Sequence, residues 1–177
     1  MNSAQTRKIV FGGMIAALYV VLTYVANAMG LASGAIQIRL SECLTILPCL
    51  MTAAIPGLAI GCVLANLLTG CMALDVIFGS LATLLGAIGT RLLRKKPALA
   101  WIPPVISNMV IVPLLLIYVY QVPDVSVTIP FTETTLSGSG YIPLMITVGI
   151  GEIISCGILG LFVHRVLRHA LPSKLLD

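Results

Sequence analysis

The sequence contains six acidic side chains, and one of them lies where a charge is least expected. Glu152 is the only charged residue between Thr134 and His164, a stretch of otherwise apolar and small residues. A carboxylate at the centre of a membrane helix costs about 2.5–3.5 kcal/mol on insertion scales, so it needs a partner or a water-filled cavity. Glu152 is therefore a candidate ligand-binding group, with a structural hydrogen bond to a neighbouring helix as the alternative.

Five further polar residues lie beside or inside apolar stretches. Arg39 and Glu42 are three residues apart, so they could bind a ligand or pair with each other along a helix. Asp75 precedes an apolar run and could bind a ligand or cap the helix that follows. Asn66 and Asn108 could contact a ligand or form hydrogen bonds between helices.

The motifs of common enzymes are missing from the sequence. It has no P-loop, no HExxH and no GxSxG, so it is predicted neither to be its own ATPase nor to carry these forms of catalysis. Its two histidines, His164 and His169, follow the last apolar stretch, away from most of the acids. The five cysteines show no CxxC spacing and are interpreted as small core residues rather than metal ligands or disulfides. We expect no enzyme and no cofactor.

Composition determines the class of protein that must position these groups. Of 177 residues, 59% are hydrophobic and 9% are charged, with a mean hydropathy of +1.10. A soluble domain carries about 25% charged residues, so a cytosolic enzyme, a nucleic-acid-binding module and a secreted disulfide-rich domain are excluded. The apolar stretches are long rather than alternating, which indicates an all-α integral membrane protein, expected as one domain over 1–177 in the cell membrane.

The apolar stretches predict six transmembrane helices. They lie within residues 9–30, 42–55, 57–71, 76–90, 97–123 and 134–164, with a break at Pro56-Gly57 because 43–74 is too long for one span. This arrangement puts nine of the ten Lys and Arg residues on the side of the termini and Arg39 on the other. Since basic residues favour the inside, both termini are predicted to be cytoplasmic.

Two of the predicted helices, 42–55 and 76–90, are shorter than the roughly 20 residues that span a bilayer comfortably. Each begins on the predicted outer side beside a carboxylate, Glu42 or Asp75. We therefore expect a polar concavity on the outer face, covered by the connections at 30–41, 70–75 and 122–140.

The first helix carries two small-residue motifs near its predicted cytoplasmic end. Gly12 and Ala16 are four residues apart, as are Gly13 and Ala17. This spacing lets another helix approach closely. The partner could be another subunit or a helix of the same chain.

Several segments together resemble a known family. They are QIRLSECLTILP at 37–48, IPGLAIGC at 55–62, ANL at 65–67 and DVIFGSLATL at 75–84. The sequence resembles the QueT family, the substrate-binding S components of energy-coupling factor (ECF) transporters, over essentially its whole length. The resemblance implies an S-component-like bundle that binds a queuosine precursor, a 7-deazaguanine such as queuine or its aminomethyl precursor.

The resemblance also implies partners. These are a membrane coupling subunit of the EcfT type and two cytoplasmic ATPases of the EcfA type. S components of this kind are thought to topple in the membrane and to dock through small residues on their first helix, here Gly12, Gly13, Ala16 and Ala17. The motif positions that the resemblance transfers to this chain are Gln37, Arg39, Glu42, Asn66 and Asp75.

The chemistry of a deazaguanine agrees with these residue types. Its N1–H and 2-amino groups are adjacent donors that one carboxylate can accept, and its O6 suits an amide or Arg donor. We predict Glu42 and Glu152 as acceptors with Asp75 third, and Gln37, Asn66 and Tyr141 nearby. The alternative is a stand-alone proton- or ion-coupled transporter of a small cationic or nucleobase-like solute, in which Glu152 relays protons.

Overall fold

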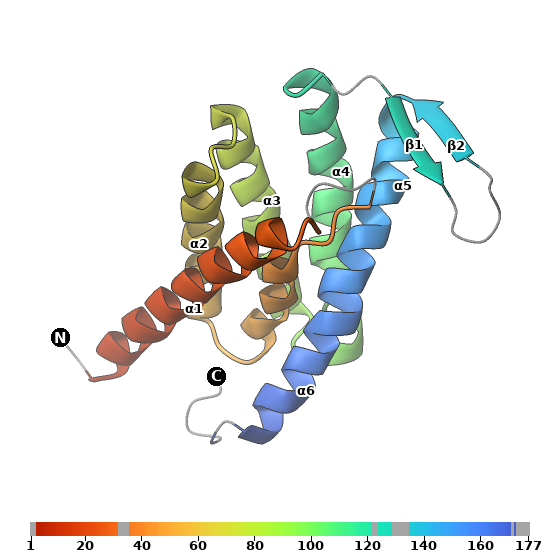
Figure 1. Cartoon of the computed structure of the whole chain (residues 1–177). Helices are drawn as coiled ribbons and strands as arrows, with labels where there is room; N and C mark the ends of the chain where they lie inside the picture. Colours follow the sequence, from red (N-terminus) through yellow and green to blue (C-terminus); the bar gives the residue numbers. More distant parts are fainter. Residues whose placement is uncertain (1–2, 32–35, 122–123, 129–134, 171, 173–177) are drawn as a thin grey trace.

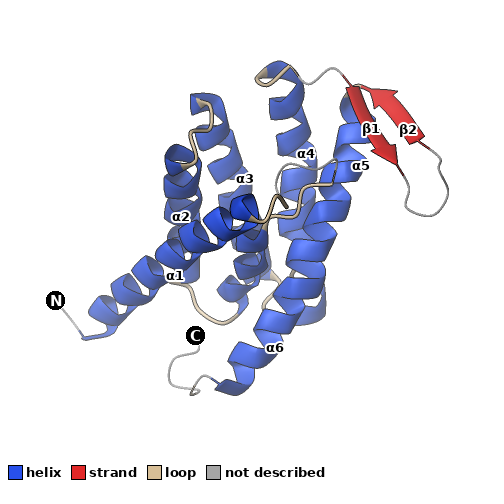
Figure 2. Ribbon diagram, viewed as in Figure 1, coloured by secondary structure: helices blue, strands red, loops and turns tan. Residues whose placement is uncertain are grey.

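The computed structural model describes residues 3–31, 36–121, 124–128, 135–170 and 172. This part of the chain is a helical bundle with one small β-hairpin (Figures 1 and 2). The helices are, in chain order, α1 (Ser3–Ala28), the 3₁₀ helix η1 (Leu40–Cys49), α2 (Ala54–Leu68), α3 (Ala73–Leu92), the short 3₁₀ turn η2 (Pro97–Leu99), α4 (Ile102–Tyr118), α5 (Tyr141–Glu152), the π-helical segment η3 (Ile153–Leu159) and α6 (Gly160–Ala170). The last three run on without interruption.

The membrane class predicted from composition is confirmed. Within the described residues, four helical segments are long and apolar enough to span a membrane: Gln5–Ala28, Ala73–Leu92, Pro97–Tyr118 and Tyr141–Ala170. Leu40–Cys49 and Ala54–Leu68 are shorter apolar helices, so the described chain has six apolar helices, of which four rather than the predicted six are long enough to span. Large hydrophobic side chains such as Ile9, Leu92 and Phe162 are exposed on the outside of the bundle, as a lipid environment requires.

The break in the second apolar stretch lies earlier than predicted. The chain turns at residues 50–53, and α2 begins at Ala54, so Pro56 lies in the first turn of the helix. A proline is tolerated there because the first backbone N–H groups of a helix have no partner inside the helix. The Pro-Gly pair therefore marks the start of α2 rather than the turn before it.

The prediction of a short helix at 76–90 was wrong. α3 has 20 residues and includes Asp75 in its first turn and Arg91 in its last. An acid at the start and a base at the end both stabilise the helix dipole, so charges at these ends do not terminate the helix. The segment at 42–55 is even shorter than expected, because η1 has only ten residues.

The predicted connection at 122–140 contains two strands, β1 (Asp124–Thr128) and β2 (Thr135–Ser139). They pair antiparallel, with Asp124 opposite Ser139 and Thr128 opposite Thr135. The hairpin lies at one end of the bundle, beyond α4 and α5 (Figure 2). It is an addition to the predicted all-α class. Residues 122–123 and 129–134 of this connection, and residues 32–35 of the predicted connection at 30–41, lie outside the described residues.

η1 forms the centre of the bundle. Its residues from Ser41 to Cys49 are all buried, and it contacts α1, α2, α3, α6 and η3. The hydrophobic core around it includes Leu44 and Leu47 together with Tyr19 of α1 and Leu58 of α2. This short helix is shielded from lipid by its neighbours.

The two small-residue motifs of α1 have different environments. Gly12 and Ala16 face α2, where a Cβ at Gly57 would lie 2.7 Å from the Gly12 carbonyl oxygen and a Cβ at Gly61 would lie 3.0 Å from the Ala16 Cα. Gly13 and Ala17, by contrast, are exposed. The first motif therefore serves packing within the chain, and only the second is accessible to another protein.

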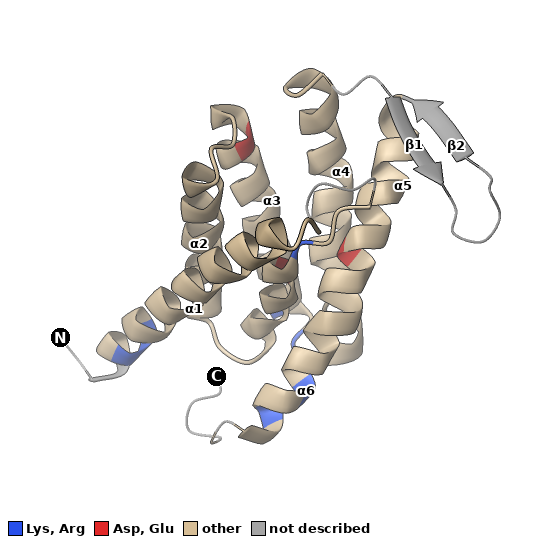
Figure 3. Cartoon of the chain, viewed as in Figure 1, with Lys and Arg blue, Asp and Glu red and all other residues tan. Residues whose placement is uncertain are grey.

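The charges separate along the bundle (Figure 3). Basic residues lie near the start of α1, between α3 and α4 and on α6, at the end where both termini lie. Asp75 lies in the first turn of α3, at the other end of that helix. Lys174, which was predicted to belong to the basic group, lies outside the described residues.

Candidate binding site

A cavity of about 420 Å³ lies between the C-terminal ends of α1, α2 and α4 and the start of α3. This volume falls in the range of about 300–1,000 Å³ that is typical of small-molecule sites. The lining residues are Thr23, Ala26, Asn27, Gln37, Arg39, Ser41, Asn66, Thr69, Cys71, Asp75, Val112, Leu115, Leu116 and Tyr120. The cavity thus combines an apolar α4 surface with polar groups from four other segments.

Arg39, Asn66 and Asp75 connect three of these segments. The Arg39 Nη2 atom donates a hydrogen bond to Asn66 Oδ1 at 3.4 Å, and Asn66 Nδ2 donates to the backbone oxygen of Asp75 at 3.5 Å. Within the described chain, Arg39 and Glu42 form no ion pair, so the alternative that they pair with each other along a helix is wrong. The guanidinium group is instead directed to the cavity wall, beside Asn66.

Asp75 is held by a residue that the sequence did not indicate. The hydroxyl group of Tyr120 donates to Asp75 Oδ2 at 2.9 Å and accepts a hydrogen bond from the backbone N–H of Met72 at 3.3 Å. Burial and the hydrogen bond to Asp75 raise the pKa of Tyr120 to about 12, so the phenol remains a donor at neutral pH. The N-cap of α3 is Met72, so Asp75 is not a helix cap and its other carboxylate oxygen can face a ligand.

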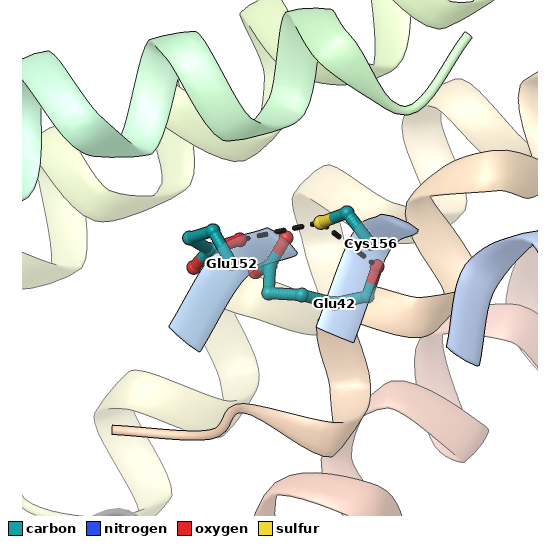
Figure 4. A group of neighbouring side chains, drawn as sticks. All are labelled: Glu42, Glu152 and Cys156. Atoms are coloured by element: carbon teal, nitrogen blue, oxygen red, sulfur yellow. Dashed lines mark hydrogen bonds between the residues drawn. The ribbon is translucent and has the colours of Figure 1, made fainter. Parts of the chain in front are cut away.

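A second group of acids is buried beside the cavity. We call Glu42, Glu152 and Cys156 the acid cluster (Figure 4). These residues are 0%, 3% and 1% exposed, and one potential ligand atom from each lies within 4.8 Å of the other two. Cys156 Sγ donates to Glu152 Oε2 at 3.2 Å and to the backbone oxygen of Glu42 at 3.5 Å.

The carboxylate of Glu42 has one bonded and one free oxygen. Oε1 accepts a short hydrogen bond from the Tyr19 hydroxyl and a longer one of 3.4 Å from Thr83. Oε2 is buried and has no hydrogen-bond partner among the residues that the structure describes. Arg39 interacts electrostatically with both Glu42 and Glu152, so it is the cation that links the cavity to the acid cluster.

Local backbone structure brings the acid cluster together. Glu152 ends α5 and Cys156 lies in the π-helical segment that follows, so the two side chains project from successive turns toward η1. π-Helical segments are rare and are frequent at functional sites. Gly151 lets the loop approach, because a Cβ there would overlap the carbonyl oxygen of Gln37.

Comparison with known proteins identifies the family. The family model described as QueT transporter matches residues 9–169, nearly the whole chain. The chain belongs to the QueT transporter family. It is also similar to the queuosine precursor transporter QueT of Lactococcus lactis subsp. cremoris, with 37% identity over 84 residues. That alignment spans 48% of this chain and 49% of the relative, about half of each. No solved structure matches the chain.

The structure of this QueT family member places the eight predicted ligand-binding residues in four different environments. Four of them line the cavity: Gln37, Arg39, Asn66 and Asp75. Glu42 and Glu152 face each other in the acid cluster, and Asn108 is fully buried on α4. Tyr141 does not line this cavity, because its hydroxyl donates to the backbone oxygen of Val110 at 3.0 Å and ties α5 to α4. The roles of all eight in ligand binding stay predictions.

Proposed function

We propose that this protein is the substrate-binding S component of an ECF-type importer for a queuosine precursor, queuine or aminomethyl-deazaguanine. Membership of the QueT transporter family and the similarity to the queuosine precursor transporter of Lactococcus lactis support a transporter of this class. The observation that carries the proposal is the cavity, where Asp75, Asn66, Arg39 and Gln37 converge beside an apolar helix surface. This is the donor and acceptor set that a deazaguanine requires.

We propose that Asp75 is the first carboxylate that the cargo contacts. One Asp75 oxygen is fixed by Tyr120, which leaves the other to accept the adjacent N1–H and 2-amino donors of the base. Arg39 or the amide of Gln37 supplies a donor for O6, and Leu115 on α4 supplies an apolar surface for the ring. Glu42 and Glu152 lie deeper and do not line the cavity, so this assignment departs from the order expected from the sequence.

The proposed orientation follows from the basic residues. All the described Lys and Arg residues except Arg39 lie toward the end of the bundle that carries both termini, and basic residues favour the cytoplasmic side. The termini are then cytoplasmic, and the cavity, at the other end of α2, α3 and α4, takes cargo from outside. The six apolar helices are all assigned to the membrane, with η1 buried inside the bundle.

The energy source is proposed to be separate. The sequence has no P-loop, so ATP hydrolysis is assigned to two EcfA-type ATPases acting through an EcfT-type coupling subunit. The exposed motif of Gly13 and Ala17 is the proposed docking face on α1, because its partner motif is already packed against α2.

Calorimetric titration of the detergent-purified protein tests the cargo assignment. Queuine or aminomethyl-deazaguanine should bind, whereas riboflavin should not, and guanine should bind more weakly. Asp75→Asn should weaken binding by at least about tenfold, or about 1.4 kcal/mol. Binding of riboflavin alone, or no heat with any deazaguanine from folded protein, would reject the proposal.

Uptake by cells separates the importer from the ion-coupled alternative. Uptake of the labelled base should require co-expressed EcfT- and EcfA-type subunits, and these should co-purify with the protein. Uptake that persists without the ATPases and collapses with the proton gradient would favour a stand-alone secondary transporter instead.

A further inference from the structure

Among the described residues, the acid cluster has more acidic groups than the one cation that acts on it, Arg39. Glu42, Glu152 and Cys156 are almost completely buried, and Arg39 is the cation that acts on both carboxylates. If both were ionised, two buried carboxylates beside one guanidinium would carry one uncompensated negative charge, so the cluster must hold either a proton or a cation. The cluster is therefore built to receive positive charge.

Unpartnered polar atoms point to the same conclusion independently. Among the described residues, Glu42 Oε2 has no hydrogen-bond partner, and neither atom of the Asn108 amide forms a hydrogen bond of full geometry. Asn108 is 0% exposed and lies beside the Glu152 carboxylate. Buried polar groups without a partner are rare in folded proteins, so the free Glu42 oxygen and the Asn108 amide beside Glu152 indicate a ligand.

We propose that Glu42, Glu152 and Cys156 bind one divalent metal ion, preferentially Zn²⁺, with the Asn108 amide oxygen completing the site. A thiolate with carboxylates suits Zn²⁺, whereas Mg²⁺ and Ca²⁺ take oxygen ligands only. A tetrahedral Zn²⁺ with bonds of about 2.0–2.3 Å separates its ligand atoms by about 3.3–3.8 Å. Cys156 Sγ and Glu152 Oε2 are already 3.2 Å apart, and the three ligand atoms lie within 4.8 Å, so side-chain rotations of about 1 Å complete the geometry.

Metal binding also balances charge and protons. When the metal binds, the Cys156 thiol, which donates a hydrogen bond to Glu152 in this structure, loses its proton to solvent, as does any proton held by the two carboxyl groups. Two carboxylates, one thiolate, one Zn²⁺ and the Arg39 guanidinium then sum to zero. The cavity offers a route for the ion, because Ser41 lines it and Glu42 follows directly in the chain.

This site goes beyond the proposed function and does not depend on the identity of the cargo. The cavity residues take the cargo, and the metal lies beside them and fixes η1 to the π-helical segment. A cationic amine of the cargo could supply the same positive charge to the acid cluster. The experiment must therefore distinguish a metal ion from the cargo.

The test uses the purified full-length chain, stripped with a chelator and then titrated with ZnCl₂. We expect one Zn²⁺ per chain and release of one to two protons, seen as a binding heat that changes with buffer. Co²⁺ in place of Zn²⁺ should give the near-ultraviolet charge-transfer absorption of a cobalt–thiolate bond, a readout that needs no variant. Binding below one ion per ten chains, or Co²⁺ binding without this absorption, would overturn the proposal.

Variants localise the ion. Cys156→Ser and Glu152→Gln should each weaken Zn²⁺ binding at least a hundredfold, whereas Cys49→Ser should not, because Cys49 is also buried but contacts the Thr90 backbone instead. Equal loss in the control would refute the assignment. A saturating deazaguanine should leave the bound zinc unchanged, and displacement of zinc by the base would show that the acid cluster binds cargo. Zinc binding without cargo binding would reject only the proposed function.

Discussion

Replacing Gly151 with alanine would separate the loop that carries Gln37 and Arg39 from α5. The Cβ of the alanine would overlap the Gln37 carbonyl oxygen and lie 3.0 Å from its carbonyl carbon. Carbon atoms in contact prefer about 3.5–4.0 Å, so the loop must retreat by about 0.5–1 Å. The obstacle is backbone on both sides, so no flexible side chain can yield.

The displacement is large enough to break polar contacts in the cavity. Overpacking of this size costs about 1–3 kcal/mol of stability. The contact from Arg39 to Asn66 is already 3.4 Å long, and a further shift of about 0.5 Å takes it beyond a hydrogen bond. A lost hydrogen bond to a charged group costs about 1.5–3 kcal/mol, so cargo affinity should fall at least about tenfold.

Titration calorimetry of Gly151→Ala and Gly157→Ala provides the comparison. A Cβ at Gly157 would lie 3.5 Å from Trp101 Cε3, an ordinary contact, so this variant should bind cargo like the wild type. Unchanged affinity in a folded Gly151→Ala protein would refute the role of the loop in binding. Equal loss in both variants would indicate a general effect on the helix rather than the loop.

Three further perturbations have distinct expected outcomes. Tyr120→Phe removes a hydrogen bond to Asp75, worth about 0.5–1.5 kcal/mol, and should weaken cargo binding up to about tenfold. The difference from the wild type should disappear as the pH approaches 12, where the Tyr120 phenol, whose pKa is raised to about 12, loses its proton. Tyr24→Phe, which lies outside the cavity, should not change binding. Gly57→Ala should lower the thermal unfolding temperature, by about 1–3 kcal/mol of stability, because its Cβ would lie 2.7 Å from an α1 carbonyl oxygen. Gly13→Leu should preserve stability and cargo binding but reduce co-purification of the coupling subunit, because no atom of a neighbouring described residue lies within 4 Å of an added Cβ.

Patterns along the chain were sufficient to predict the bundle. Long apolar stretches report the membrane directly, and an acid inside one of them had to be buried with partners, as Glu152 is. Four of the predicted site residues line one cavity because they occur just before or after helix ends, and helix ends meet at one side of a bundle. The boundaries were less predictable, since Pro56 and Asp75 fit equally well just inside a helix and just outside it.

Contacts between distant segments could not be predicted. Tyr120 binds Asp75 across 45 residues of sequence, and no local pattern distinguishes it from other tyrosines near a membrane surface. Glu42 and Cys156 are 114 residues apart in the sequence, and they come into contact only because η1 packs against a π-helical segment. Because a π-helical segment shifts the helical register by a fraction of a turn, a regular 3.6-residue period misplaces the side chains in and after it.

The short central helix explains how acids can be stable at this depth. A ten-residue 3₁₀ helix is about 20 Å long, less than the hydrocarbon thickness of about 30 Å. It need not span, because α1, α2, α3 and α6 surround it and its residues from Ser41 to Cys49 are buried. Non-helical backbone at membrane depth is tolerated only where protein or water covers it. The chain at 37–39 meets this condition, since it borders the cavity above η1, and the same protection keeps the Glu42 carboxylate away from lipid.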